Sequence, residues 1–167
     1  MIDFAALQEL VLENRTVDST LHGIAHWRQV ESNGLLLASA TGADATVVRL
    51  FALFHDCKRM NDGDDAGHGP RGAEFAKRCY AEGLLCITPE QFARLRHACS
   101  CHTTEPRSGD ATIDTCYDAD RLDLGRVGIT LDPARMATAP GGIIARKALR
   151  AKVGVHEMRE WLKTIRL

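Results

Sequence analysis

The sequence predicts an all-α protein, built as one compact helical bundle over residues 1–167. Apolar residues recur every three or four positions along most of the chain, which is the spacing of a buried helix face. Helix-start signals precede several of these stretches, and the alternating pattern of a β-strand is scarce. No internal repeat, low-complexity tract or interdomain linker divides the 167 residues, and this length supports one substantial core.

Three helices are predicted in the first part of the chain. Asp3 can cap a first helix whose apolar residues follow helical spacing, and residues 21–40 form the second predicted helix. Residues 41–44 resemble a turn followed by a helix cap, and a third, very apolar helix follows them. Residues 57–72 are rich in glycine and acidic residues, and they are expected to form an irregular loop.

The second part of the chain is also predicted to be helical. Residues 88–91 give the sharpest start signal, a threonine cap followed by proline and, at the third helical position, glutamine. A polar loop over residues 103–110 follows that helix, and another helix is predicted over residues 113–124. The proline and glycines at 139–142 are expected to break the last segment, leaving one or two helices within residues 133–167.

The composition argues against several kinds of partner. A formal net charge of −1 and an isoelectric point near 6.6 provide no attraction to nucleic acid or to an anionic membrane. No apolar stretch approaches the roughly 20 residues that span a bilayer. The N-terminal segment resembles an amphipathic helix with acidic residues rather than a signal peptide. We therefore expect a cytoplasmic protein that binds neither nucleic acid nor membranes.

The six cysteines are numerous for a chain of this length. Because no secretory signal is recognised, they are expected to be reduced thiols rather than disulfides. Cys99, Cys101 and His102 resemble half of a zinc site, but one residue separates the cysteines and no second pair follows. We interpret the cysteines as small buried core residues.

Histidine and aspartate residues interrupt the apolar pattern at two places. His55 and Asp56 directly follow the apolar third helix, where ionisable groups are costly to bury unless they are paired or bind metal. Asp120 lies on the apolar stripe of its own helix, so it also requires a cation. Asp118 and Asp123 fall off that stripe, and they are expected to face solvent or other partners.

A third group lies upstream of these two. His22 and His26 are four residues apart, so we expect them to be neighbours on one helical face. No glutamate lies between them, which excludes the helical zinc-protease motif. Taken in order along the chain, the three groups suggest a divalent-metal site gathered from three helices. His156 lies outside this pattern and is interpreted as structural or solvent-exposed.

The residues around these groups resemble, in the same order, the HD-domain superfamily of metal-dependent phosphohydrolases. The matching segments are residues 21–30, 54–56 and 118–122, and the pattern extends over residues 21–128, about two thirds of the chain. The resemblance implies an all-α domain of the HD type, to which residues 133–167 add C-terminal helices. It also implies four metal ligands, which are His26, His55, Asp56 and Asp120.

Some members of the superfamily hold a second metal ion through two further histidines. The resemblance places His68 and His102 at those positions, with His97 as a weaker alternative to His102. Imidazole and carboxylate ligands suit Mn²⁺, Fe²⁺, Co²⁺, Ni²⁺ or Zn²⁺, and suit Mg²⁺ less well. We therefore expect one or two divalent metal ions as the cofactor.

The ligand types also indicate a mechanism. A metal held in this way lowers the pKa of bound water; with two ions, Asp56 would bridge them and hydroxide would attack phosphorus. Arg59 and Arg71 are candidates for binding the phosphate oxygens, and an exposed loop charge is the alternative for each. His22 is a candidate proton donor to the leaving group, or a hydrogen-bond partner within the site.

The expected function is hydrolysis of a phosphomonoester or phosphodiester in a small phosphorylated metabolite or nucleotide. The chain lacks the extended motif of cyclic-dinucleotide phosphodiesterases and the synthetase domain of alarmone enzymes, so neither a particular substrate nor an oligomeric state is predicted. Two alternatives remain open. One is a non-catalytic metal- or nucleotide-binding module, and the other is a di-iron oxygenase on the same scaffold.

Overall fold

The computed structural model describes residues 2–167, and these residues form helices and connecting loops without any strand. The all-α prediction is therefore confirmed. Three short 3₁₀ helices lie at Leu124–Val127, Pro133–Arg135 and Val155–Glu157. The α-helices are α1 (Phe4–Glu13), α2 (Ile24–Thr41), α3 (Ala45–Phe54), α4 (His68–Ala81), α5 (Pro89–Cys101), α6 (Ala111–Arg121), α7 (Ala139–Arg150) and α8 (Met158–Leu162).

Side-chain caps explain where several helices begin. The carboxylates of Asp3, Asp44 and Asp110 accept hydrogen bonds from the first free backbone N–H groups of α1, α3 and α6. Thr88 and Gln91 form the capping box predicted for the start of α5. The turn predicted before α3 is also confirmed, because α2 ends at Gly42 in the left-handed conformation, with φ of 72°.

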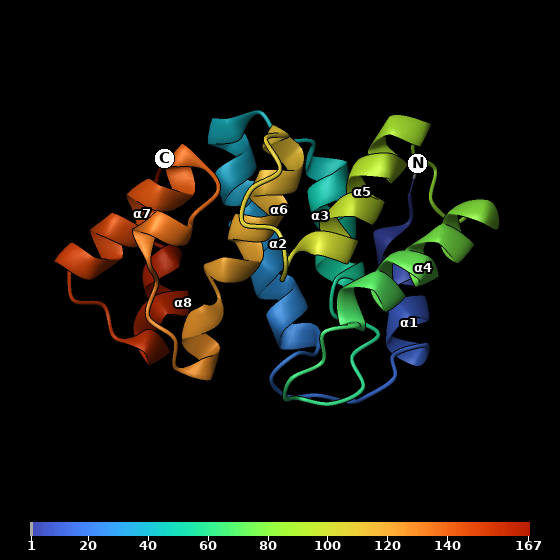
Figure 1. Ribbon diagram of the computed structural model, residues 1–167, viewed down its shortest axis with the longest axis horizontal. Coiled ribbons are helices and arrows are strands. Elements are labelled where there is room, and N and C mark those ends of the chain that lie inside the picture. Colours follow the sequence, from blue (N-terminus) through green and yellow to red (C-terminus); the bar gives the residue numbers. More distant parts are fainter. Residues whose placement is uncertain (1) are drawn as a thin grey trace.

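Helices α2 and α6 run side by side through the centre of the molecule (Figure 1). On one side lie α3, α4 and α5, with α1 against α3; on the other side lie α7 and α8. The larger hydrophobic core surrounds α3, whose residues Phe51 and Phe54 are fully buried. A smaller second core, around Leu122, Ile144 and Leu162, joins α7 and α8 to the central pair.

Two helix starts differ from the sequence prediction, and both concern candidate site residues. Helix α2 begins at Ile24, so His22 lies in the preceding loop and does not share a helical face with His26. Helix α4 begins at His68 itself, within the segment that was expected to be irregular up to residue 72. Pro70 is compatible with this start because a proline in the first helical turn loses no intrahelical hydrogen bond.

The predicted break at residues 139–142 is wrong, because these residues form the first turn of α7. The Thr138 hydroxyl caps this turn by accepting a hydrogen bond from the Gly141 N–H. A Cβ atom at Gly141 would collide with the Asp118 carboxylate, which is why a glycine is required in the turn. The composition of this segment therefore reflects close packing against α6 rather than the end of a helix.

Asp118 and Asp123 were predicted to face solvent or other partners, and they face protein partners, because both are buried, with exposed fractions of 0% and 1%. The Asp118 carboxylate accepts hydrogen bonds from the backbone of Ala137 (2.7 Å) and from the backbone and hydroxyl of Thr138 (2.8 and 2.7 Å). These bonds compensate its burial and hold the start of α7 against α6. Asp123 serves the candidate site, as described below.

The cysteines agree with their interpretation as core residues in four of six cases, since Cys57, Cys79, Cys99 and Cys116 are buried. All six are free thiols. Among residues 2–167, no helix has both the length and the apolar character needed to cross a membrane.

Thiol labelling should follow this burial. Cys86 is exposed, whereas burial raises the pKa of the Cys57 thiol to about 12, so that little thiolate forms near neutral pH. In a short pulse of N-ethylmaleimide followed by peptide mass spectrometry, we expect Cys86 to be modified first and Cys57 to stay unmodified. After denaturation all six should react. Rapid labelling of Cys57 or Cys99 in the folded protein would contradict the packing around α3.

Candidate metal centre

Five helices bring the predicted ligands to one place in the larger core. His55 and Asp56 directly follow α3, and His26 lies in the first turn of α2. The other three predicted ligands also lie at helix ends. Asp120 is in the last turn of α6, His68 is the first residue of α4, and His102 is the C-terminal cap of α5. Residues far apart in the sequence thus meet because helix ends converge on the end of the buried helix α3.

The first group of ligand atoms surrounds one oxygen of Asp56. The Nε2 atoms of His26 and His55 lie 3.1 Å apart, and they are 3.5 and 3.7 Å from Asp56 Oδ2. Asp120 Oδ1 completes this group at 3.3 Å from His26 Nε2 and 3.9 Å from His55 Nε2. His26, His55 and Asp56 are therefore close enough to one another to hold one ion, and Asp120 lies beside the two imidazole nitrogens.

A second group surrounds the other oxygen of the same carboxylate. The Nε2 atoms of His68 and His102 lie 2.9 Å apart, and they are 3.1 and 4.0 Å from Asp56 Oδ1. Both groups have the closeness and donor types of a metal site. Asp56 is shared by them, with one oxygen turned to each.

The hydrogen bonds of the four histidines test whether a cation fits between them. Each ring has its Nδ1 atom against a protein oxygen. A carbonyl or ionised carboxylate oxygen can only accept a hydrogen bond, so Nδ1 must carry the proton. The partners are Asp123 Oδ2 for His26 (2.7 Å), Phe51 O for His55 (3.1 Å), Asp65 O for His68 (2.5 Å) and Cys99 O for His102 (2.9 Å). In a neutral ring, Nε2 is then a bare acceptor.

Facing acceptors require a cation between them. His68 and His102 present their Nε2 lone pairs to each other at 2.9 Å, beside a carboxylate oxygen, and His26 and His55 do so at 3.1 Å. Histidine ligands of metals commonly donate their other N–H to a carbonyl or carboxylate, as all four do here. The residues present therefore fit one divalent cation in each group.

The electrostatic environment favours neutral His55 and His102 and an ionised Asp56. Burial lowers the pKa of His55 to about 3 and also lowers the pKa of His102. Burial opposes ionisation of Asp56, but the neighbouring His55, His22 and His68 outweigh it and hold the pKa of this carboxyl well below its usual range. Neutral histidines and a charged aspartate are the forms that bind metal.

His26 differs from His55, the other histidine of the first group. Its burial acts to lower the pKa, but hydrogen bonds to Asp120 and Asp123 outweigh this effect and raise the pKa above 6.5. His68 of the second group also has a raised pKa: burial acts to lower it, but Asp56 and the Asp65 carbonyl outweigh this effect. A metal ion bound at the first group has to displace the second proton of His26.

Two glycines of α4 allow the second group to form. A Cβ atom at Gly69 would collide with the carbonyl of Cys99 and lie 3.2 Å from the His102 ring. A Cβ atom at Gly72 would collide with the carbonyl of Phe54. Without these side chains α4 packs directly against α5 and the end of α3, which brings His68 to Asp56.

The other predicted site residues differ in how near they lie to this centre. His22 Nδ1 is 2.9 Å from Asp56 Oδ2, and the Arg126 guanidinium lies 3.2 Å from the same nitrogen. Arg59 also lies at the centre, with its NH1 3.4 Å from Asp56 Oδ1 and 3.3 Å from the His68 ring. His22 and Arg59 are thus brought to the cluster by two loops, the one before α2 and the one after α3.

Arg71 is not placed for the phosphate-binding role that the sequence suggested. Its NH2 group donates to both carboxylate oxygens of Asp65, at 2.6 and 2.5 Å, and its Nε donates to the carbonyl of Lys58. These bonds fix the loop before α4, whose Asp65 carbonyl holds His68. His97, the alternative to His102, pairs with Glu105 at 2.8 Å instead of joining the cluster.

Three residues that the sequence reasoning did not assign also belong to the site: Asp123, Arg126 and Arg159. Asp123 is fixed to His26, and Arg159 of α8 binds the Asp123 carboxylate through two bonds of 2.7 Å. Asp123 lies just beyond the end of α6, off the apolar stripe that identified Asp120, so the stripe gave no signal for it. Nothing in the local pattern indicated Arg159.

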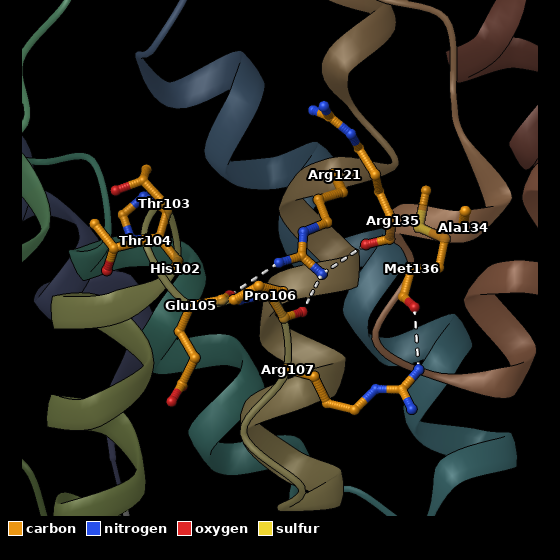
Figure 2. A pocket seen from close by; sticks show the side chains of 10 residues that line it. All are labelled: His102, Thr103, Thr104, Glu105, Pro106, Arg107, Arg121, Ala134, Arg135 and Met136. Atoms are coloured by element: carbon orange, nitrogen blue, oxygen red, sulfur yellow. Dashed lines mark hydrogen bonds between the residues drawn. The ribbon is translucent and has the colours of Figure 1, made fainter.

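An open cleft of about 540 Å³ borders the centre at His102. Three arginines and one glutamate line it, and the glutamate, Glu105, is already bound by Tyr117 and His97. Figure 2 shows the Arg121 guanidinium bound to carbonyls of Glu105, Pro106 and Arg135, which ties two loops together. The cleft therefore carries excess positive charge, with Arg107 and Arg135 exposed along it.

A comparison with solved structures shows that the fold is shared with a protein of known structure. The chain resembles the crystal structure of a predicted HD superfamily hydrolase from an uncultured Thermotogales bacterium, with a TM-score of 0.69 and 23% sequence identity. The likeness covers 96% of this chain and 90% of that one. No protein-family model and no curated protein matches the sequence.

Proposed function

We propose that this protein is a metal-dependent phosphohydrolase that cleaves a phosphate ester in a small metabolite or nucleotide. The observation that carries the proposal is the Asp56 carboxylate, which turns one oxygen to each of two groups of buried ligand atoms. The proposed ligands are His26, His55, Asp56 and Asp120 for one ion, and Asp56, His68 and His102 for a second. The cofactor would be Mn, Fe, Co, Ni, Zn or, less favourably, Mg.

A divalent metal at such a centre supplies a hydroxide nucleophile from water near neutral pH and neutralises charge on the phosphate. The chain's own residues have complementary tasks. Arg59, beside Asp56 and His68, would bind phosphate oxygens and stabilise the charge that develops on them. His22 is only partly buried and lies at the edge of the cluster, where it can pass a proton to the departing oxygen.

The cleft supports a small anionic substrate. Its volume of about 540 Å³ lies within the range of small-molecule sites. Arg107 uses one bond, of 3.3 Å, to the carbonyl of Met136, and the Arg135 side chain is 86% exposed. Donors of both guanidinium groups thus stay available to a ligand. A substrate lying here would have one end near His102.

The proposal is tested by turnover of a phosphate-ester panel. Metal-free protein is reloaded with Mn²⁺ under argon and assayed against nucleoside monophosphates, sugar phosphates and a bis-aryl phosphodiester. We expect metal-dependent release of phosphate or of one alcohol without oxygen. A metal-loaded protein inert to the whole panel would instead favour a binding module. Activity on any substrate that requires both O₂ and reduced iron would favour the oxygenase, because the same ligands also suit iron.

Metal affinity should depend on pH. Because His26 has a raised pKa and must lose its second proton before binding metal, protons compete with the ion below that pKa. We expect the apparent affinity for Mn²⁺ to fall as pH is lowered from about 8 to about 6, approaching about tenfold per pH unit for each proton displaced. Isothermal titration in buffers of different ionisation enthalpy measures both the affinity and the protons released. An affinity independent of pH in this range would contradict the assignment of His26.

A further inference from the structure

Asp123 joins the candidate metal centre to the last helix of the chain. It is 1% exposed, and its Oδ2 lies 2.7 Å from Nδ1 of His26. Arg159 of α8 binds the same carboxylate as a fork, from Nε to Oδ1 and from NH2 to Oδ2, both at 2.7 Å. The fork satisfies both oxygens at once, which fixes the direction in which Oδ2 faces His26.

Burial makes this arrangement dependent on the arginine. A carboxylate as deeply buried as Asp123 is costly without a cation, and removing one partner of such a pair leaves an uncompensated charge. Arg126 lies farther from the carboxylate, at 3.8 Å, and donates instead to the Asp123 carbonyl and toward His22. Arg159 is therefore the principal counter-charge of Asp123.

The position of Arg159 depends in turn on how α8 is packed. Met158 and Leu162 of α8 are buried in the second core, and a Cβ atom at Gly125 would lie 3.3 Å from the Met158 Cβ. The short helix thus lies directly against the turn that follows Asp123. Figure 1 shows α8 on the side of α2 and α6 away from α4 and α5.

We infer that Asp123 is a positioning residue for His26 and that Arg159 holds it, so that metal binding and the docking of α8 are coupled. The inference rests on the proposed metal centre. Asp123 keeps the proton of His26 on Nδ1 and orients the ring, leaving Nε2 for the metal. Coupling of this kind is reciprocal: whatever factor α8 docking adds to metal affinity, metal adds to α8 docking.

The test measures the dissociation constant for Mn²⁺ of the metal-free full chain by titration calorimetry. We expect Asp123→Asn and Arg159→Gln each to weaken binding by about 10- to 100-fold, and Arg159→Lys to recover part of the loss. Asp118→Asn is the matched control. Asp118, in α6, is as deeply buried as Asp123, but its carboxylate binds only Ala137, Thr138 and Arg121. The control change should lower thermal stability while leaving Mn²⁺ affinity unchanged.

The outcomes separate this inference from the proposed function. A wild-type protein that binds no Mn²⁺ overturns the metal centre and the inference together. Wild-type binding that is unchanged in folded Arg159→Gln protein overturns the inference alone, and so does an equal loss of affinity in Asp118→Asn.

Hydrogen exchange of the unmodified chain gives a second, independent reading that does not depend on any variant's folding. Mn²⁺ should slow amide exchange in residues 158–162, because an ion that binds more tightly when α8 is docked must in turn favour the docked helix. Exchange in α8 that is indifferent to Mn²⁺, in a protein that binds the ion, would also overturn the inference.

Discussion

Replacing Asp56 with asparagine is expected to abolish turnover and to empty both metal groups at once. Asp56 is the one carboxylate that faces all four cluster histidines, His26, His55, His68 and His102. An amide of the same shape keeps the packing but loses the charge that both ions need. Because a catalytic metal stabilises the transition state by several kcal/mol, we expect a loss of about 10³-fold or more in kcat/KM.

The Asp56→Asn experiment requires both a metal count and a rate. Elemental analysis of protein purified with Mn²⁺ should show the ions of the wild type reduced toward none, while circular dichroism shows an unchanged helix content. Asp118→Asn provides the comparison, since it also neutralises a buried aspartate but away from the cluster. If Asp56→Asn kept full metal content and activity, the shared-carboxylate arrangement would be wrong.

Replacing Gly72 with alanine is expected to produce a large loss of stability. Its new Cβ atom would collide with the backbone carbonyl of Phe54 and lie 3.2 Å from that of His55, and neither carbonyl is free to move. Such overpacking against backbone should cost about 3 kcal/mol of the free energy of unfolding. Relief of the clash moves α4 outward, which withdraws His68 from Asp56.

Gly142→Ala is the control for this change. A Cβ atom at Gly142, also in a helix, would meet only the flexible end of Arg146, at 3.4 Å. Alanine is the better helix former, so this variant should be as stable as the wild type or up to about 1 kcal/mol more stable. Denaturant unfolding of the metal-free proteins measures both differences. Equal stability of Gly72→Ala and Gly142→Ala would contradict the close packing of α4 on α3.

The part of the site nearest α3 could be predicted because its evidence is local. The apolar run before His55 and Asp56 identifies a buried helix, and two ionisable residues at its end require a compensating cation. Asp120, on the apolar stripe of its helix, likewise requires a compensating cation. These arguments use neighbours in sequence, and the structure brings these side chains together.

Helix starts were predicted less well, for two reasons. Apolar spacing alone cannot separate His22 from the helix that follows. The backbone at Gly23 is extended, with φ of −93° and ψ of −158°, so α2 begins only after this residue. Glycine and proline near His68 resembled a loop, although Pro70 suits a first helical turn and Gly69 is required by the approach of α5. In both places tertiary packing decided the outcome.

The contacts that support the ligands could not be predicted at all. Arg159 reaches Asp123 across 36 residues, and the pair forms only because the second core holds α8 against the turn after α6. The pairing of Arg71 with Asp65 was not predicted either, since Asp65 lies in a loop with no periodic pattern. The Asp123–Arg159 pair depends on three-dimensional docking, which one sequence does not encode in any local motif.

The most direct test of the central claim is anomalous scattering at the manganese edge from crystals of the Mn²⁺-loaded protein. Two peaks are predicted, one bordered by His26, His55, Asp56 and Asp120 and the other by Asp56, His68 and His102. A map from fully loaded crystals with no peak beside the Asp56 carboxylate would contradict the account.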